Sequence, residues 1–288
     1  MRQSPWACTI FIQLSLCVAI YVSLHLGRSL LFSDADNGRH LDLHFITVSG
    51  GSRPLHQQNR LLKLMGSVAR SYNARVVVSI SDIGDKDPLF RNATRVSSSL
   101  KLPWYITGDS RENESGYFTK RIKLPIGGAL DIVFIATGSS QQHGPTNTVS
   151  DGSGSSRVNE LTRALKAANA DWRIVVGSDP LFVDMQGKEP KEVEQVDETF
   201  HQLLIDNGVN VYLSDKGCIN GTNQTGIACI VVPTPTENRR SSSSTKRKKE
   251  DGFLLHRLSF SDLLTSFIGS SGVVVDTRSV KQKGKEAM

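Results

Sequence analysis

The sequence lacks the short motifs that mark several common enzyme classes. It contains no G-x-x-x-x-G-K-[ST] phosphate-binding loop, no G-x-G-x-x-G fingerprint and no G-x-S-x-G elbow. These absences argue against nucleotide-phosphate cradles and against a serine hydrolase. The chain has seven histidines, but few lie where a metal site would need them. Only His56 and His143 fall in predicted loops, and neither ends a strand, so a transition-metal centre is poorly supplied with imidazole ligands.

Outside one segment, the sequence has no excess of charge of either sign. The formal net charge is +6, and residues 239–249 contain six cations and no anion: Arg239, Arg240, Lys246, Arg247, Lys248 and Lys249. The remaining charges balance, so the composition predicts no nucleic-acid partner. Three interpretations stay open for this basic, serine-rich loop (residues 236–251): a solvated insertion, a protease- or phosphorylation-sensitive segment, and a site for an acidic partner.

The amino-terminal segment lacks charge altogether over residues 6–26. About 20 such residues span a bilayer core of roughly 30 Å, and no small-x-small cleavage site follows. We therefore expect an uncleaved transmembrane signal-anchor over residues 6–27, after a short cytosolic tail (1–5) and before a polar stalk (28–40). A cleaved signal peptide and a core helix are the alternatives.

Glycosylation motifs and cysteines bear on the compartment of the remaining chain. Four N-x-S/T sequons favour modification in the secretory lumen, at Asn92, Asn113, Asn220 and Asn223. Of the four cysteines, only Cys218 and Cys229 lie outside the anchor. In an oxidising lumen they could close a small disulfide loop, and the alternative is two unpaired thiols. The sequence thus predicts a type II, single-pass membrane protein of the secretory pathway that contacts the membrane through its N-terminal helix.

Strand and helix patterns alternate downstream of the stalk. Apolar and alternating runs predict strands over residues 43–49, 75–80, 103–107, 131–137, 173–176, 209–213 and 227–232. Amphipathic spacing predicts helices over residues 59–72, 158–170 and 191–208, and antiparallel strands over 252–277 close the chain. This order predicts an α/β fold, a two-sheet mixed β-sandwich flanked by helices over residues 41–280, with a polar tail at 281–288.

Polar residues gather where the predicted strands end. They are Ser49, Asp82 with Asp85, Asp109, Ser178 with Asp179, and Ser214 with Asp215. Several converging loops that carry carboxylates are the layout of a metal-dependent phosphoesterase. A luminal transferase would need a D-x-D metal motif, and two triplets have that pattern. Asp34-Ala-Asp36 lies in the stalk, and Asp85-Lys86-Asp87 is interpreted as a surface turn.

Five segments in order resemble the low-molecular-weight purple acid phosphatases, within the calcineurin-like metallophosphoesterases: residues 44–69, 76–90, 102–112, 171–182 and 208–219. The resemblance implies a dinuclear metal centre, yet most of its ligand positions are substituted. Asp82 matches the bridging aspartate and is the only ligand retained. Ser49 or Gly50 stands for the first aspartate, Asp85 for the tyrosine, Asp109 for the asparagine, Ser110 for the catalytic histidine, Ser178 and Asp179 for a histidine pair, and neither histidine of the last segment survives.

The resemblance therefore implies the metallophosphoesterase fold and argues against its activity, because the two metal ions carry that chemistry. We expect a catalytically inactive pseudophosphatase that acts by binding or as a structural partner, with no catalytic residue, no cofactor and an unidentified protein partner. The alternative is a residual or altered metal-dependent phosphoesterase. It would hold a weakly bound divalent cation, a hard ion such as Mg²⁺ or Ca²⁺, at Asp82, Asp109 and Asp179.

Overall fold

The computed structural model describes residues 12–20, 42–51, 53–108, 117–125, 127–135, 161–168, 170–178, 201–216, 226–234 and 251–282. The chain divides into two compact units, Met1–Arg39 and His40–Met288. In the first unit, residues 12–20 form a helix with exposed side chains. Among the described residues, no helix combines the length and the apolar character that a membrane crossing needs. The rest of the predicted span, 6–11 and 21–27, lies outside them, so the anchor stays a prediction.

The second unit contains a six-stranded mixed sheet with the order β11-β10-β9-β1-β2-β3. Its strands are β1 (Leu43–Ser49), β2 (Val77–Ile80), β3 (Trp104–Ile106), β9 (Gly252–Leu258), β10 (Asp262–Gly269) and β11 (Val274–Lys281). The first three run parallel, and β9 pairs antiparallel with β1. The predicted closing strands are confirmed, and β11 runs to Lys281, past the predicted domain end at residue 280.

A five-stranded mixed sheet has the order β4-β5-β6-β7-β8. Its strands are β4 (Tyr117–Lys123), β5 (Ala129–Ile135), β6 (Trp172–Gly177), β7 (Val211–Ser214) and β8 (Ala228–Val231). Strands β5 to β8 run parallel, and only β4 is antiparallel to its neighbour. The sequence did not predict β4, because the cations of YFTKRIK interrupt its apolar alternation. One of them, Arg121, forms a bidentate ion pair with Asp131 of β5, at 2.8 Å for each bond.

The two sheets pack face to face around one apolar core. Buried side chains from both sheets meet there, among them Phe45, Ile80, Phe134, Trp172, Val176 and Leu254. Trp172 is fully buried, and its indole Nε1 donates a hydrogen bond to the carbonyl of Ser259, 3.2 Å away. This bond joins the five-stranded sheet to the turn between β9 and β10. The predicted α/β fold with two mixed sheets is thus confirmed.

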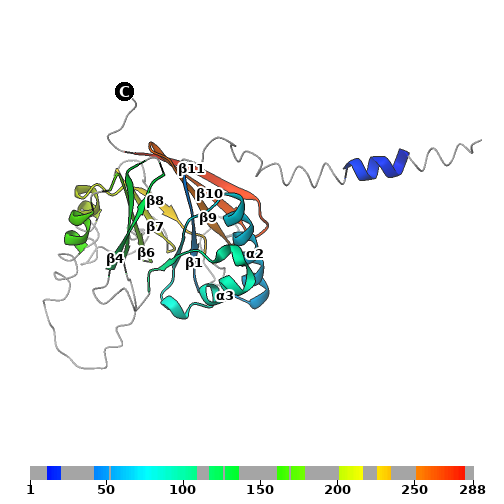
Figure 1. Ribbon diagram of the computed structural model, residues 1–288, viewed down its shortest axis with the longest axis horizontal. Coiled ribbons are helices and arrows are strands. Elements are labelled where there is room, and N and C mark those ends of the chain that lie inside the picture. The colour runs from blue at the N-terminus through cyan, green and yellow to red at the C-terminus, as the bar shows by residue number, and fades with distance from the viewer. Residues whose placement is uncertain are drawn as a thin grey trace, which may run out of the picture. The chain divides into compact units, whose positions relative to one another are not determined.

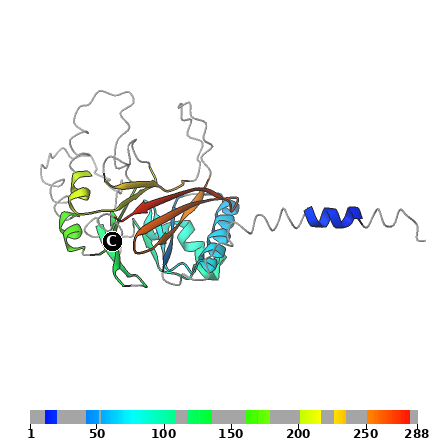
Figure 2. The same cartoon turned by 90° about the horizontal axis from the view of Figure 1, so that it is seen from above.

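Helices cover the outer face of each sheet (Figures 1 and 2). On the side of the six-stranded sheet lie α2 (Leu55–Ser71), α3 (Pro88–Val96) and the 3₁₀ turns η2 (Gly84–Lys86) and η3 (Ser98–Leu100). Helical residues 161–167 and 201–206 cover the other sheet, where Leu161, Leu165 and Leu204 pack against Val133, Val175 and Tyr212. The second of these helices ends at Asp206, and Gly208, two residues later, has φ +65°, the left-handed conformation typical of a glycine that follows a helix.

Candidate functional site

The carboxyl ends of parallel strands from both sheets meet at one place, which we call the strand-end site: Ser49, Asp82, Ser178, Ser214 and Asp215. Its centre is the carboxylate of Asp215, which follows β7. Ser49 Oγ at the end of β1 donates to Asp215 Oδ2 at 3.1 Å, and Ser178 Oγ after β6 donates to Asp215 Oδ1 at 3.0 Å. Ser49 belongs to one sheet, and Ser178 and Asp215 belong to the other. These hydrogen bonds therefore link the two sheets at their strand ends.

Burial and charge set the protonation of this carboxylate. Ser49, Ser178 and Ser214 are buried. Desolvation raises the pKa of Asp215 above its ordinary value, while the hydrogen bonds from Ser178 and Ser49 lower it. The negative charge of Asp82 raises this pKa further, and Lys216 lowers it. Asp82 is itself exposed. The Asp82 carboxylate thus lies close enough to raise the pKa of Asp215, although the two residues follow strands of different sheets.

A second buried carboxylate, Asp87, lies beside the loops that follow β1 and β2. Its Oδ2 accepts hydrogen bonds from Ser81 Oγ at 2.6 Å and from the Gly51 amide at 2.8 Å. Its Oδ1 caps α3 by accepting from the Leu89 amide at 2.8 Å. A Cβ at Gly50 would stand 2.0 Å from Asp87 Oδ2, so the close approach needs glycine there. The prediction of a surface turn at 85–87 is wrong for Asp87, because three donors draw its carboxylate inward.

Two further contacts fix the loops around the strand ends. Thr107 Oγ1 accepts from the Ser81 amide at 2.9 Å and donates to the Ser81 carbonyl at 3.1 Å, which joins the end of β3 to that of β2. The buried guanidinium of Arg53 contacts the carboxylate of Asp251 at 3.1 Å through Nε and Nη2. This pair ties the loop after β1 to the start of β9. Asp251 was assigned to the basic loop and belongs instead to a structural ion pair.

Among the described histidines, His256 serves the structure rather than this site. His256 is fully buried, and its ring nitrogens lie 2.9 Å from Thr265 Oγ1 and 3.0 Å from Thr47 Oγ1. Burial lowers its pKa to about 3, so the ring is neutral at physiological pH. His56, predicted in a loop, is instead an exposed residue of α2. The prediction was wrong because α2 begins four residues before its apolar pattern shows.

Several predicted site residues lie outside the described residues: Asp109, Ser110, Asp179, Cys218, Asn113, Asn220 and Asn223. Cys229 is buried in β8 and takes part in a disulfide. Its pairing with Cys218 stays a prediction. Asn92 lies in α3, half-buried. Its glycosylation, like that of the other three sequons, is untested.

The residues described at the strand ends do not fit the dinuclear centre that the resemblance implies. Within the described ranges, no group of three or more His, Cys, Asp or Glu side chains is placed to hold an ion. The hydroxyls of Ser49 and Ser178 both donate to Asp215. The resemblance places Ser178 at one ligand position, and Ser49 or its neighbour Gly50 at another. The sequence places Asp215 at a strand end but did not predict a role for it. The pattern that could have indicated one is the Ser-Asp pair that occurs both after β6 and at the end of β7.

No family model matches the sequence, and no curated protein matches it either. Among solved structures, the chain is similar to GAP50, the anchor in the inner membrane complex of Plasmodium, with a TM-score of 0.59 and 17% identity over 85% of this chain and 90% of that one. It also matches PhoD (TM-score 0.48, 10% identity, 86% and 70% covered) and Vps29 from Entamoeba histolytica (0.35, 9%, 83% and 99%). The similarity to GAP50 shows that the chain shares that protein's fold, an α/β fold of two mixed sheets that is metallophosphoesterase-like.

Proposed function

We propose that this protein is a degenerate purple-acid-phosphatase-like protein that has lost catalysis and acts by binding or as a structural partner. One observation carries the proposal: both oxygens of Asp215 accept hydrogen bonds from Ser49 and Ser178. The family resemblance expects a histidine at Ser178, and it expects an aspartate at Ser49 or at the adjacent Gly50. A metallophosphoesterase activates water between two metal ions, which carry most of the transition-state charge. A hydroxyl is a much poorer metal ligand than a carboxylate or an imidazole. The hydrogen bonds of Ser49 and Ser178 to Asp215 therefore favour a structural link between the two sheets over metal binding.

The proposed setting is a membrane surface in the secretory pathway. The uncharged stretch of residues 6–27 supports an anchor, and the four sequons support a luminal domain behind it. GAP50 is described as an anchor in a membrane complex. We extend a scaffolding role of this kind to the present chain as part of the proposal. A gel shift on glycosidase treatment is expected, and its absence would count against the luminal location.

The second candidate is a residual phosphoesterase. The negative charge of Asp82 acts on Asp215, so two carboxylates lie near one another at the strand ends. Asp109 and Asp179, outside the described residues, would have to complete a set of oxygen ligands for a hard ion such as Mg²⁺. Asp82 is central to this candidate, since it is the only ligand position of the family that the sequence keeps.

The two candidates are separated by metal content and turnover on the same preparation. The purified full chain would be incubated with Mg²⁺, Mn²⁺, Fe³⁺ or Zn²⁺, freed of excess metal, and assayed with a phosphomonoester at acidic and neutral pH. We expect substoichiometric metal and no turnover above that of Asp82→Ala. Stoichiometric metal together with turnover that disappears in Asp82→Ala would overturn the proposal.

A further inference from the structure

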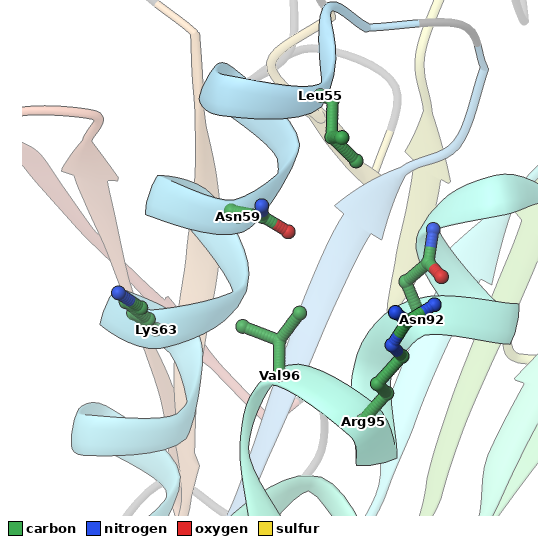
Figure 3. Close-up of a pocket in the computed structure, with 6 residues that line it drawn as sticks. All are labelled: Leu55, Asn59, Lys63, Asn92, Arg95 and Val96. Carbon is green, nitrogen blue, oxygen red and sulfur yellow. The ribbon is translucent and has the colours of Figure 1, made fainter.

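A cavity of about 340 Å³ lies between helices α2 and α3, away from the strand-end network (Figure 3). Helix α2 lines it with Leu55, Asn59 and Lys63, and α3 lines it with Asn92, Arg95 and Val96. Residues spaced by three or four lie on one face of a helix, so each helix contributes one stripe. At 1.5 Å per residue, the α2 stripe is about 12 Å long. We call this cavity the α2–α3 groove.

Contacts between the two helices hold the groove in shape near both ends. Close to Leu55, Asn92 Nδ2 donates to Oε1 of the buried Gln58 at 2.8 Å. Past Lys63, Gly66 lets the residue after α3 come close, because a Cβ at Gly66 would stand 2.0 Å from Ser97 Oγ. The walls therefore need little rearrangement to receive a ligand, which lowers the entropic cost of binding.

The charge of the groove has one sign. Lys63 and Arg95 line it, and neither α2 nor α3 contains an aspartate or a glutamate. Within the part of the chain that the structure describes, neither cation forms an ion pair. Outside the basic loop the positive and negative charges of the sequence balance, because acidic residues elsewhere in the chain offset the cations of α2 and α3. The net charge therefore does not show that these two helices carry only cations. The groove therefore has a local positive potential that the net charge does not report.

Apolar surface accompanies these cations. The side chain of Leu55, at the first turn of α2, is 66% exposed, and Val96 of α3 is half-buried. The amide of Asn59 lies between Leu55 and Lys63 on the same stripe and adds a donor and an acceptor. A ligand that fits has an anionic group for the cations and an apolar side chain for Leu55.

We propose that the α2–α3 groove binds an acidic segment of a protein partner. Acidic side chains of the segment lie near Lys63 of α2 and near Arg95 of α3, and an apolar side chain packs on Leu55. The positive charge selects an anion, and the adjoining apolar surface favours a peptide over a nucleic acid or a bare phosphate. This inference rests on the proposed binding role and identifies the surface that would carry it. The two proposals are tested separately: metal content and turnover test the strand-end site, and peptide binding tests the groove.

The test uses the purified full chain and a fluorescein-labelled peptide with glutamate and leucine at helical spacing. Fluorescence anisotropy measures its dissociation constant, beside a second peptide with lysine for every glutamate. The groove variant is Lys63→Glu with Arg95→Glu. The matched control is Arg60→Glu with Arg91→Glu, which makes the same charge change on the same two helices outside the groove. Thermal unfolding checks that both variants fold like the wild type.

We expect the glutamate peptide to bind and the lysine peptide not to bind. The groove variant should weaken binding by about tenfold or more, since two charge contacts are reversed, and the control by about threefold or less. Leu55→Ser should also weaken binding. Equal losses in the groove variant and the control would overturn the proposal, as would no binding to the wild type. Tighter groove-dependent binding of RNA or of phosphatidylserine vesicles would overturn it as well.

The sequon at Asn92 supplies an independent test. Asn92 forms part of the groove wall, and its Nδ2 is the atom to which an N-linked glycan would attach. A glycan there would lie in the groove and exclude a peptide. The inference therefore departs from the sequence expectation at this one sequon: it requires Asn92 to be unmodified in the chain isolated from its own cells, while the other three sequons stay candidates for glycosylation. Peptide mapping by mass spectrometry reads this directly, and full occupancy of Asn92 would contradict the inference.

Discussion

The strand-end site and the α2–α3 groove differ in how their polar groups are satisfied. At the strand ends, the Asp215 carboxylate accepts from Ser49 and Ser178, and the nearby Asp87 accepts from three further donors. In the groove, Lys63 and Arg95 face a cavity without an ion-pair partner among the described residues. At the strand ends the carboxylates are held by internal hydrogen bonds, while the outer faces of α2 and α3 carry cations that have no ion-pair partner among the described residues. Substitutions should therefore cost stability at the first region and binding at the second.

The largest loss of stability is expected for Asp87→Ala. The change leaves Ser81 Oγ and the amides of Gly51 and Leu89 without their acceptor in a buried setting. We expect the free energy of unfolding to fall by about 3 kcal/mol. Urea denaturation measures this, with Asp85→Ala as the control, since that half-buried neighbour in η2 should cost less than about 1 kcal/mol. Equal losses in the two variants would show that the buried carboxylate is not a structural centre.

The hydroxyls of Ser49 and Ser178 should contribute less, about 1 kcal/mol each. Both donate to the same carboxylate, so their effects should not add in the double variant. Urea denaturation of Ser49→Ala, Ser178→Ala and the pair gives the coupling energy. Ser67→Ala, an exposed serine on α2, is the control and should change stability by less than about 0.5 kcal/mol. Additive losses would mean that Asp215 does not link the two sheets.

The ionisation of Asp215 should make the free energy of unfolding depend on pH. Its pKa is raised above the ordinary 3.8, chiefly by desolvation, so the folded state binds this proton more tightly than the unfolded state does. The stability contributed by this group is therefore greatest below pH 3.8 and declines as pH rises through the raised value. Relative to Asp215→Asn, the wild type should lose stability across that window in urea titrations at successive pH values. A wild type that gains stability over the same window would reverse the assigned sign.

The smallest effect on stability is expected for the groove. Lys63→Glu with Arg95→Glu removes no hydrogen bond or ion pair within the described residues, so the free energy of unfolding should change by less than about 0.5 kcal/mol. The same variant should lose peptide binding. Thermal unfolding and anisotropy on one preparation check both halves. A variant that unfolds much more easily would place these cations among the structural groups and remove the contrast between the two regions.

Much of the fold follows from local pattern, and little of the site does. Apolar runs such as residues 174–176 predicted the buried parallel strands, because a strand covered on both faces is largely apolar. Strand β4 was not predicted, because its cations break the apolar pattern and the acidic partner of Arg121 is Asp131 on β5, which the local sequence of β4 does not reveal. Asp87 escaped for a related reason. A carboxylate in a polar triplet resembles a turn until the donors from the loops after β1 and β2 converge on it.

The site depended on the meeting of segments that lie far apart in the chain. Ser49 and Asp215 are separated by 166 positions, and only the packing of the two sheets brings their side chains together. Sequence reasoning found that the strand ends lacked ligands, but it did not find what replaced them. The sequence did not predict the groove, because its two cations lie on different helices and acidic residues elsewhere cancel them in the net charge. Local composition cannot report a surface that two helices share.

The most direct test of the central claim is anomalous X-ray diffraction from crystals of the full chain soaked in Mn²⁺. The account predicts no anomalous peak within coordination distance of Asp82 or Asp215, with Ser49 and Ser178 still hydrogen-bonded to the Asp215 carboxylate. A strong peak bound by Asp82 and Asp215, with the two serines turned away, would contradict it.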